Sequence, residues 1–98
     1  MVITEARELH RDVTATLTEF VRALAAAFPG ALEQEGNRYR VHDATAAMEL
    51  QISPGPNRNI ASLSLPTLAV IIRFTAGEAP ACAALLAHLD RYLHRGGG

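Results

Sequence analysis

Residues 38–52, RYRVHDATAAMELQI, decide the fold class, because their apolar side chains occupy alternate positions on both sides of a turn at Asp43-Ala44. A period of two is typical of strands that bury one face and leave the other open. The apolar positions are Tyr39, Val41, Ala46, Met48, Leu50 and Ile52. This stretch therefore predicts a pair of antiparallel strands in a half-covered sheet.

Between Thr4 and Phe28 the apolar residues follow a helical period instead. They recur at three- and four-residue steps, which places them on one stripe of a helix. The members of this stripe are Leu9, Val13, Leu17, Phe20, Leu24 and Phe28. Thr4 is the expected N-cap, and Pro29-Gly30 ends the pattern. We expect one helix over the whole segment, with Leu17 and Phe20 buried against the sheet.

A second helical stripe follows Pro80, which suits the first turn of a helix. Its members are Cys82, Leu85, Leu86, Leu89 and Leu93. We expect Cys82 to be buried and structural, because free cysteines are among the most buried residues. Gly96 is the expected C-cap. The last three glycines also match the tail of Gly-Gly carrier proteins, but a helix leads into them, so a carrier role is a remote alternative.

The segment between these parts is harder to interpret. SPGPNRN, residues 53–59, has the composition of a loop. In residues 60–74 the apolar residues change parity at Pro66, which leaves two alternatives: one long strand with a bulge, or a hairpin around Pro66-Thr67. Both alternatives place the same apolar residues on the inner face of the sheet, namely Leu63, Val70, Ile72 and Phe74.

Together these patterns predict an α+β two-layer sandwich formed by residues 1–98 as a single domain. An N-terminal helix, an antiparallel β-meander of about three to five strands and a C-terminal helix follow one another, with both helices on one face of the sheet. The helix–sheet–helix order is loosely similar to that of small secretion-chaperone domains. This is a likeness of architecture, which implies no function.

Composition excludes several classes of protein. The net charge is -1, so the chain lacks the positive footprint that nucleic-acid binding requires. None of its four histidines is spaced for metal binding, and a single cysteine cannot form an internal disulfide. No apolar run is long enough for a membrane span, and the N-terminal residues do not follow a signal-peptide pattern. We expect a cytoplasmic protein without membrane, nucleic acid, metal or cofactor.

No arrangement of carboxylates, histidines or Cys82 indicates a catalytic site, so we expect a protein that is not an enzyme. Two helices on one face leave the other face of the sheet to water or to another molecule. Apolar residues such as Ile71 on that open face favour a contact with protein. The sequence therefore predicts a protein–protein interaction or accessory domain, adaptor- or chaperone-like.

The expected partner is a second copy, stacked on the open sheet face about a two-fold axis, with Glu49 of one copy reaching an arginine of the other. The alternative is a module for a small ligand or an anion that uses the sheet face and the 53–59 loop. A solvated face without a partner is the third possibility. The candidate binding residues are Arg38, Arg40, Glu49, Arg58, Ile71 and Arg73.

Overall fold

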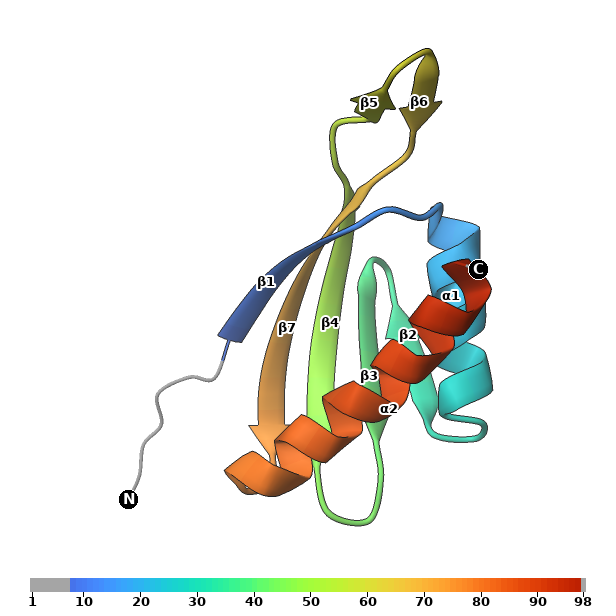
Figure 1. The fold of residues 1–98 in the computed structure, drawn as a ribbon. Coiled ribbons are helices and arrows are strands. Elements are labelled where there is room, and N and C mark those ends of the chain that lie inside the picture. Colours follow the sequence, from blue (N-terminus) through green and yellow to red (C-terminus); the bar gives the residue numbers. More distant parts are fainter. Residues whose placement is uncertain (1–7, 98) are drawn as a thin grey trace.

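The computed structural model describes residues 8–97, with side chains up to residue 93. Its elements are β1 (Glu8–Val13), α1 (Leu17–Ala27), β2 (Leu32–Glu35), β3 (Arg38–His42), β4 (Ala47–Pro54), β5 (Arg58–Ile60), β6 (Leu63–Leu65), β7 (Leu68–Ala76) and α2 (Ala79–Gly97). Figure 1 shows an antiparallel sheet with both helices on one face, and α2 crosses the strands diagonally. The predicted α+β architecture is confirmed.

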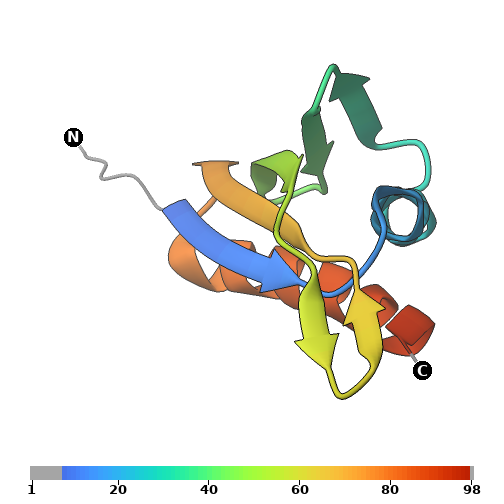
Figure 2. The ribbon, with the colours of Figure 1, turned by 90° about the horizontal axis from the view of Figure 1, so that it is seen from above.

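Five strands form the main sheet in the order β1-β7-β4-β3-β2. All neighbouring strands are antiparallel. Only β2, β3 and β4 follow one another as a meander, because β7 returns beside β4 and the first strand, β1, then adds to the edge of β7. The sheet curves around the two helices, which contact each other (Figure 2).

The N-terminal part of the predicted long helix is wrong. Residues 8–13 form β1, and α1 begins only at Leu17. The expected N-cap, Thr4, lies outside the described residues, and the observed N-cap is Thr16. The N–H of Glu19 donates to Thr16 Oγ1 over 3.1 Å, and the N–H of Thr16 donates to Glu19 Oε1 over 2.9 Å. This capping box fixes the start of the helix.

Pairing with β7 explains why residues 8–13 form a strand. Leu9, Arg11 and Val13 lie opposite Ile72, Val70 and Leu68. The backbone of β1 therefore provides hydrogen-bond partners for the backbone groups at the edge of β7. Tertiary hydrogen bonds of this kind override a local helical preference.

The shift in the start of the helix changes which residues of α1 are buried. Leu17 is now its first residue and is 48% exposed, so its expected burial is wrong. Phe20 is 1% exposed, as predicted, and it packs in the core with Leu24.

The chain between β4 and β7 forms a projecting arm of residues 55–67 (Figure 1). Strands β5 and β6 pair only with each other and turn at Ala61-Ser62. Neither alternative for Pro66 is right: the chain does not reverse there, and Pro66-Thr67 separates β6 in the arm from β7 in the main sheet. The predicted 53–59 loop is shorter than expected, because its first two residues end β4 and its last two begin β5.

The arm also divides the apolar residues that were expected on the inner face. Val70 and Ile72 are each 1% exposed, which confirms the prediction for these two. Phe74 is half-buried against the core. Leu63 is 60% exposed on the arm, so its expected place in the core is wrong. At Pro66 the chain leaves the arm, and only the residues after it can reach the core.

Three contacts hold α2 against the rest of the molecule. Cys82 is 2% exposed, as predicted, and its Sγ lies 3.5 Å from the carbonyl oxygen of Ala76. The guanidinium of Arg11 on β1 donates two hydrogen bonds to the carboxylate of Asp90, at 2.5 and 3.1 Å, and this raises the pKa of Arg11. His88 contacts the end of α1 through the carbonyl oxygen of Ala27. The helix continues to Gly97, so Gly96 is not its C-cap as expected.

Candidate functional site

The open face of the sheet carries a row of charged residues, one from each strand. The backbone register aligns Glu8 on β1, Arg73 on β7, Glu49 on β4, Arg40 on β3 and Glu33 on β2. The sign of the charge changes at every step. We call this row the charge ladder. It lies opposite the helices because the residues that flank Arg40 on β3 are buried.

Ion pairs link the members of the charge ladder. Arg73 lies 3.0 Å from Glu8 and 3.8 Å from Glu49, measured between guanidinium nitrogen and carboxylate oxygen. Arg40 lies 3.6 Å from both Glu49 and Glu33. Exposed pairs of this kind contribute about 0–1 kcal/mol each. Their main effect is local neutrality, because each arginine already has carboxylates of its own chain beside it.

The structure brings five of the six predicted site residues together on this face. Arg40, Glu49 and Arg73 belong to the charge ladder. Ile71 and Arg38 lie in the neighbouring row, on either side of Gln51, and Ile71 is half-buried. The sequence could identify these residues from the alternation within each strand. It could not identify Glu8 and Glu33 as members, because their places depend on which strands are neighbours.

The sixth predicted residue, Arg58, lies on the arm. In the β5–β6 pair, Arg58 lies opposite Leu65, and Ile60 lies opposite Leu63. Opposite residues in an antiparallel pair share a face, and so do residues two apart in one strand. Ile60, Leu63 and Leu65 therefore form one surface, the apolar arm face, with Arg58 on the same side.

The other side of the arm is polar. It carries the pair Asn59 and Ser64, and the Nδ2 of Asn57 donates to Ser64 Oγ over 3.0 Å. On the apolar arm face, by contrast, Ile60 is 49% exposed and Leu63 is 60% exposed. The arm is thus amphipathic, and its apolar side is largely exposed in the part of the chain that the structure describes.

The turn of the arm is strained at one residue. Ala61 has a φ of 54°, the only positive value for a residue other than glycine in the described part of the chain. The left-handed region costs roughly 1–2 kcal/mol for a residue with a Cβ atom. An isolated two-stranded hairpin is also marginally stable in water. The arm is therefore a part of the fold that gains little from its own contacts.

A cleft of about 610 Å³ lies on the helix side, between α1, the last described turn of α2 and the base of the arm. Its apolar lining includes Val13, Ala23, Ala26, Leu65, Pro66 and Leu93. The two alanines leave room where larger residues would fill the space. Leu65 belongs to both the cleft and the apolar arm face, so the two surfaces are continuous.

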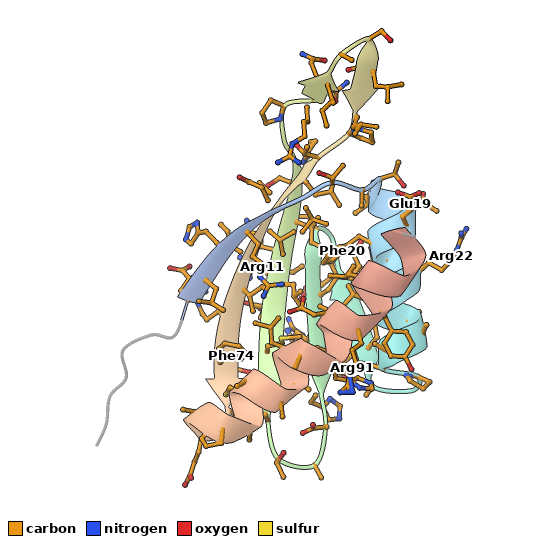
Figure 3. The ribbon with its side chains drawn as sticks, viewed as in Figure 1. Arg11, Glu19, Phe20, Arg22, Phe74 and Arg91 are labelled. Atoms are coloured by element: carbon orange, nitrogen blue, oxygen red, sulfur yellow. The ribbon has the colours of Figure 1, made fainter. Side chains whose placement is uncertain are left out.

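Polar side chains also line the cleft, and two of them are charged, Glu19 and Arg22. Figure 3 shows Glu19 near the end of α1 that is closer to the arm, whereas Arg22 extends outward from α1. The cleft was not predicted from the sequence. The alanines on the outer side of α1 were a signal, but the residues opposite them come from α2 and the arm.

Among the side chains of residues 8–93, no group of three or more histidine, cysteine, aspartate or glutamate residues is placed to hold a metal ion. Over the same residues, neither helix has the length and apolar character needed to cross a membrane. The fold and these surfaces define an α+β domain with an open, charged sheet face and an amphipathic arm. No family model matches the chain, and neither does any curated protein sequence.

Proposed function

We propose that this protein is a non-enzymatic protein-binding domain that works as a homodimer in the cytoplasm. The observation that carries the proposal is the apolar arm face, where Ile60 and Leu63 are 49% and 60% exposed on a hairpin outside the main sheet. Full burial of such a side chain contributes about 1.5–3 kcal/mol. A partner that covers both would recover roughly half of that for each.

The shape of the arm supports a protein partner. Small ligands bind in concave sites that enclose most of their surface, whereas a projecting hairpin is convex. A stable protein interface covers about 800 Å² on each partner, which needs an extended surface. The apolar arm face and the adjoining cleft together offer an extended surface.

The charged residues support a function without catalysis. General acid–base catalysis uses groups whose pKa is shifted by burial or by charged neighbours inside a pocket. The arginines and carboxylates of the charge ladder instead pair with each other on an open sheet face.

The arm is a better dimer contact than the open sheet face. The signs of the charge ladder are the same in both directions, negative at the two ends and at the centre. If two ladders are aligned and centred face to face about a two-fold axis, like charges therefore meet. In the single chain, Glu49 contacts Arg40 and Arg73 of its own sheet. Glu49 was expected to pair with an arginine of a second copy, but the arginines of its own sheet already occupy that role.

The oligomeric state tests this proposal. We expect the wild-type protein to have the mass of a dimer in sedimentation velocity at micromolar concentration. Leu63→Asp should give a folded monomer, because a carboxylate would have to be desolvated in the interface. Leu9→Asp is the matched control: Leu9 is 40% exposed on β1 and lies in neither the arm nor the cleft. A wild-type protein that stays monomeric at high concentration would refute the proposed homodimer.

A second candidate function is the binding of a small molecule, and the cleft favours it. Its volume of about 610 Å³ lies within the usual range of about 300–1,000 Å³ for such sites. An anion on the sheet face is less favoured, since it must compete with the carboxylates beside Arg40 and Arg73. A ligand at a hundred times its Kd stabilises the folded state by about 2.7 kcal/mol, which a thermal-shift screen detects. A screen of metabolites without any shift would count against this candidate.

A further inference from the structure

We propose that the homodimer forms by reciprocal exchange of arms, in which the apolar arm face of each copy seats in the cleft of the other. This inference rests on the proposed homodimer and names the surfaces that form it. Each chain carries one arm and one cleft, so a two-fold axis generates two identical contacts and leaves neither surface unused.

The two surfaces are complementary in shape and polarity. The arm projects from the molecule and presents Ile60 and Leu63 on one side. The cleft is concave and is lined mostly by apolar side chains of α1, α2 and the arm base. A partner's arm in this position would also lie against Leu65 of the host, which continues from the cleft onto the apolar arm face. The contact would thus cover both exposed apolar residues of the arm tip.

Charge selects a second copy over other apolar partners. Arg58 is the only charged residue of the arm, and it lies on the same side as the apolar arm face. Arg58 forms no ion pair with the side chains of residues 8–93 in a single chain. The lining of the cleft includes Glu19, whose Oε1 accepts the hydrogen bond from Thr16. Its second oxygen forms no hydrogen bond with the described residues and can accept from a cation. Arg58 of one copy therefore meets Glu19 of the other.

The position of Arg22 agrees with this pairing. Arg22 also lines the cleft, and a cation beside Glu19 would repel Arg58. In Figure 3, however, the side chain of Arg22 extends away from the body of the molecule, while Glu19 lies toward the arm. The carboxylate is thus the charged group nearer to an arm that enters from that end.

Charge reversal on the two surfaces provides the test. Arg58→Glu places two carboxylates together at both contacts of its homodimer, and Glu19→Arg places two cations together. Each variant alone should dimerise at least about tenfold more weakly than wild type. In an equimolar mixture, both contacts of the mixed dimer join opposite charges. Sedimentation velocity should then show a heterodimer that neither variant forms alone.

The helix cap requires a control, because Glu19→Arg also removes the hydrogen bond to Thr16. Glu19→Gln keeps a side-chain acceptor at this capping-box position while it removes the charge. Glu19→Gln should therefore weaken dimerisation, because the charge that Arg58 meets is gone. Its thermal melting curve should stay close to that of the wild type, because the helix cap is kept. Circular dichroism of all variants shows whether each one is folded.

The outcomes separate this inference from the proposed function. A heterodimer from the mixture supports arm exchange. If wild type is a dimer and both charge-reversed variants remain dimers, the homodimer stands but arm exchange is refuted. If Leu63→Asp disrupts the dimer and Glu19→Arg does not, the arm binds elsewhere, which also refutes the cleft as its seat. A monomeric wild-type protein whose cleft binds a small molecule refutes both.

Discussion

His88 holds the C-terminal end of α1 against α2, and replacing it should separate these helices at a measurable cost. Its Nε2 lies 2.8 Å from the carbonyl oxygen of Ala27. A carbonyl only accepts, so this nitrogen carries the proton and donates. The ring also makes edge-to-face contacts with Phe28 and Tyr92, with centroids 5.3 Å apart in each case. The last carbonyls of a helix lack partners within the helix, so this hydrogen bond serves as a cap from another element.

The magnitude follows from these three contacts. In His88→Ala, the carbonyl of Ala27, a residue 5% exposed, loses its donor at a cost of about 1–3 kcal/mol. Each ring contact contributes about 0.5–1.5 kcal/mol. Because His88 is half-buried, water replaces part of what is lost, and we expect a net loss near the low end, about 2–3 kcal/mol. The melting temperature should fall by roughly 10–20 °C in a domain of this size.

Urea denaturation of matched variants separates the two kinds of contact. His88→Phe keeps an aromatic ring but removes the donor, so it should recover only the part due to the rings. His88→Gln keeps a donor without the ring. If His88→Ala unfolds at the same urea concentration as wild type, this histidine does not join the helices. If His88→Phe is as stable as wild type, the hydrogen bond to Ala27 contributes nothing.

Four other parts of the structure are tested by separate substitutions. Leu17→Ala should cost less than about 1 kcal/mol of unfolding free energy because Leu17 is 48% exposed, whereas Phe20→Ala should cost about 3–5; equal losses in urea would contradict this packing. Ala61→Gly should stabilise the protein by about 0.5 kcal/mol, since glycine tolerates a positive φ, and a lower melting temperature would argue against a left-handed residue there. Backbone N–H groups that donate to Asp43 lower its pKa, so its contribution is present above the ordinary aspartate value and is lost as the pH falls through the lowered one. Asp43→Asn should therefore reduce the pH dependence of stability below about pH 4, and an unchanged acid titration of stability would speak against the turn. Ile71→Glu should leave the mass of the dimer unchanged in light scattering, and a folded monomer would move the interface to the open sheet face.

The main sheet and its open face could be predicted because strand alternation is a local signal. Tyr39 and Val41 are buried and Arg38 and Arg40 are exposed, as the period of two indicates. Residues 8–13 could not be assigned in this way. Leu9 and Val13 are four residues apart, which fits one stripe of a helix and also one face of a strand.

The sequence contains a better signal for the start of α1 than the expected N-cap, Thr4. Thr16 and Glu19 have the spacing of a capping box, and the structure forms it. The pairing of β1 with β7, by contrast, cannot be predicted from the residues of β1 alone. The same holds for the cleft and for the ends of the charge ladder, whose members come from elements far apart in the sequence.

The position of β1 has a consequence for the order in which the molecule can fold. Each residue of this strand pairs with a partner between 55 and 65 positions further along the chain, and Arg11 meets Asp90 only after 79. The turns that join β2, β3 and β4 close short loops, so these strands can pair early. Contacts between distant residues slow folding because the intervening chain must first be ordered. During synthesis from the N-terminus, β1 therefore leaves the ribosome well before β7 and remains without its neighbour until β7 has followed it.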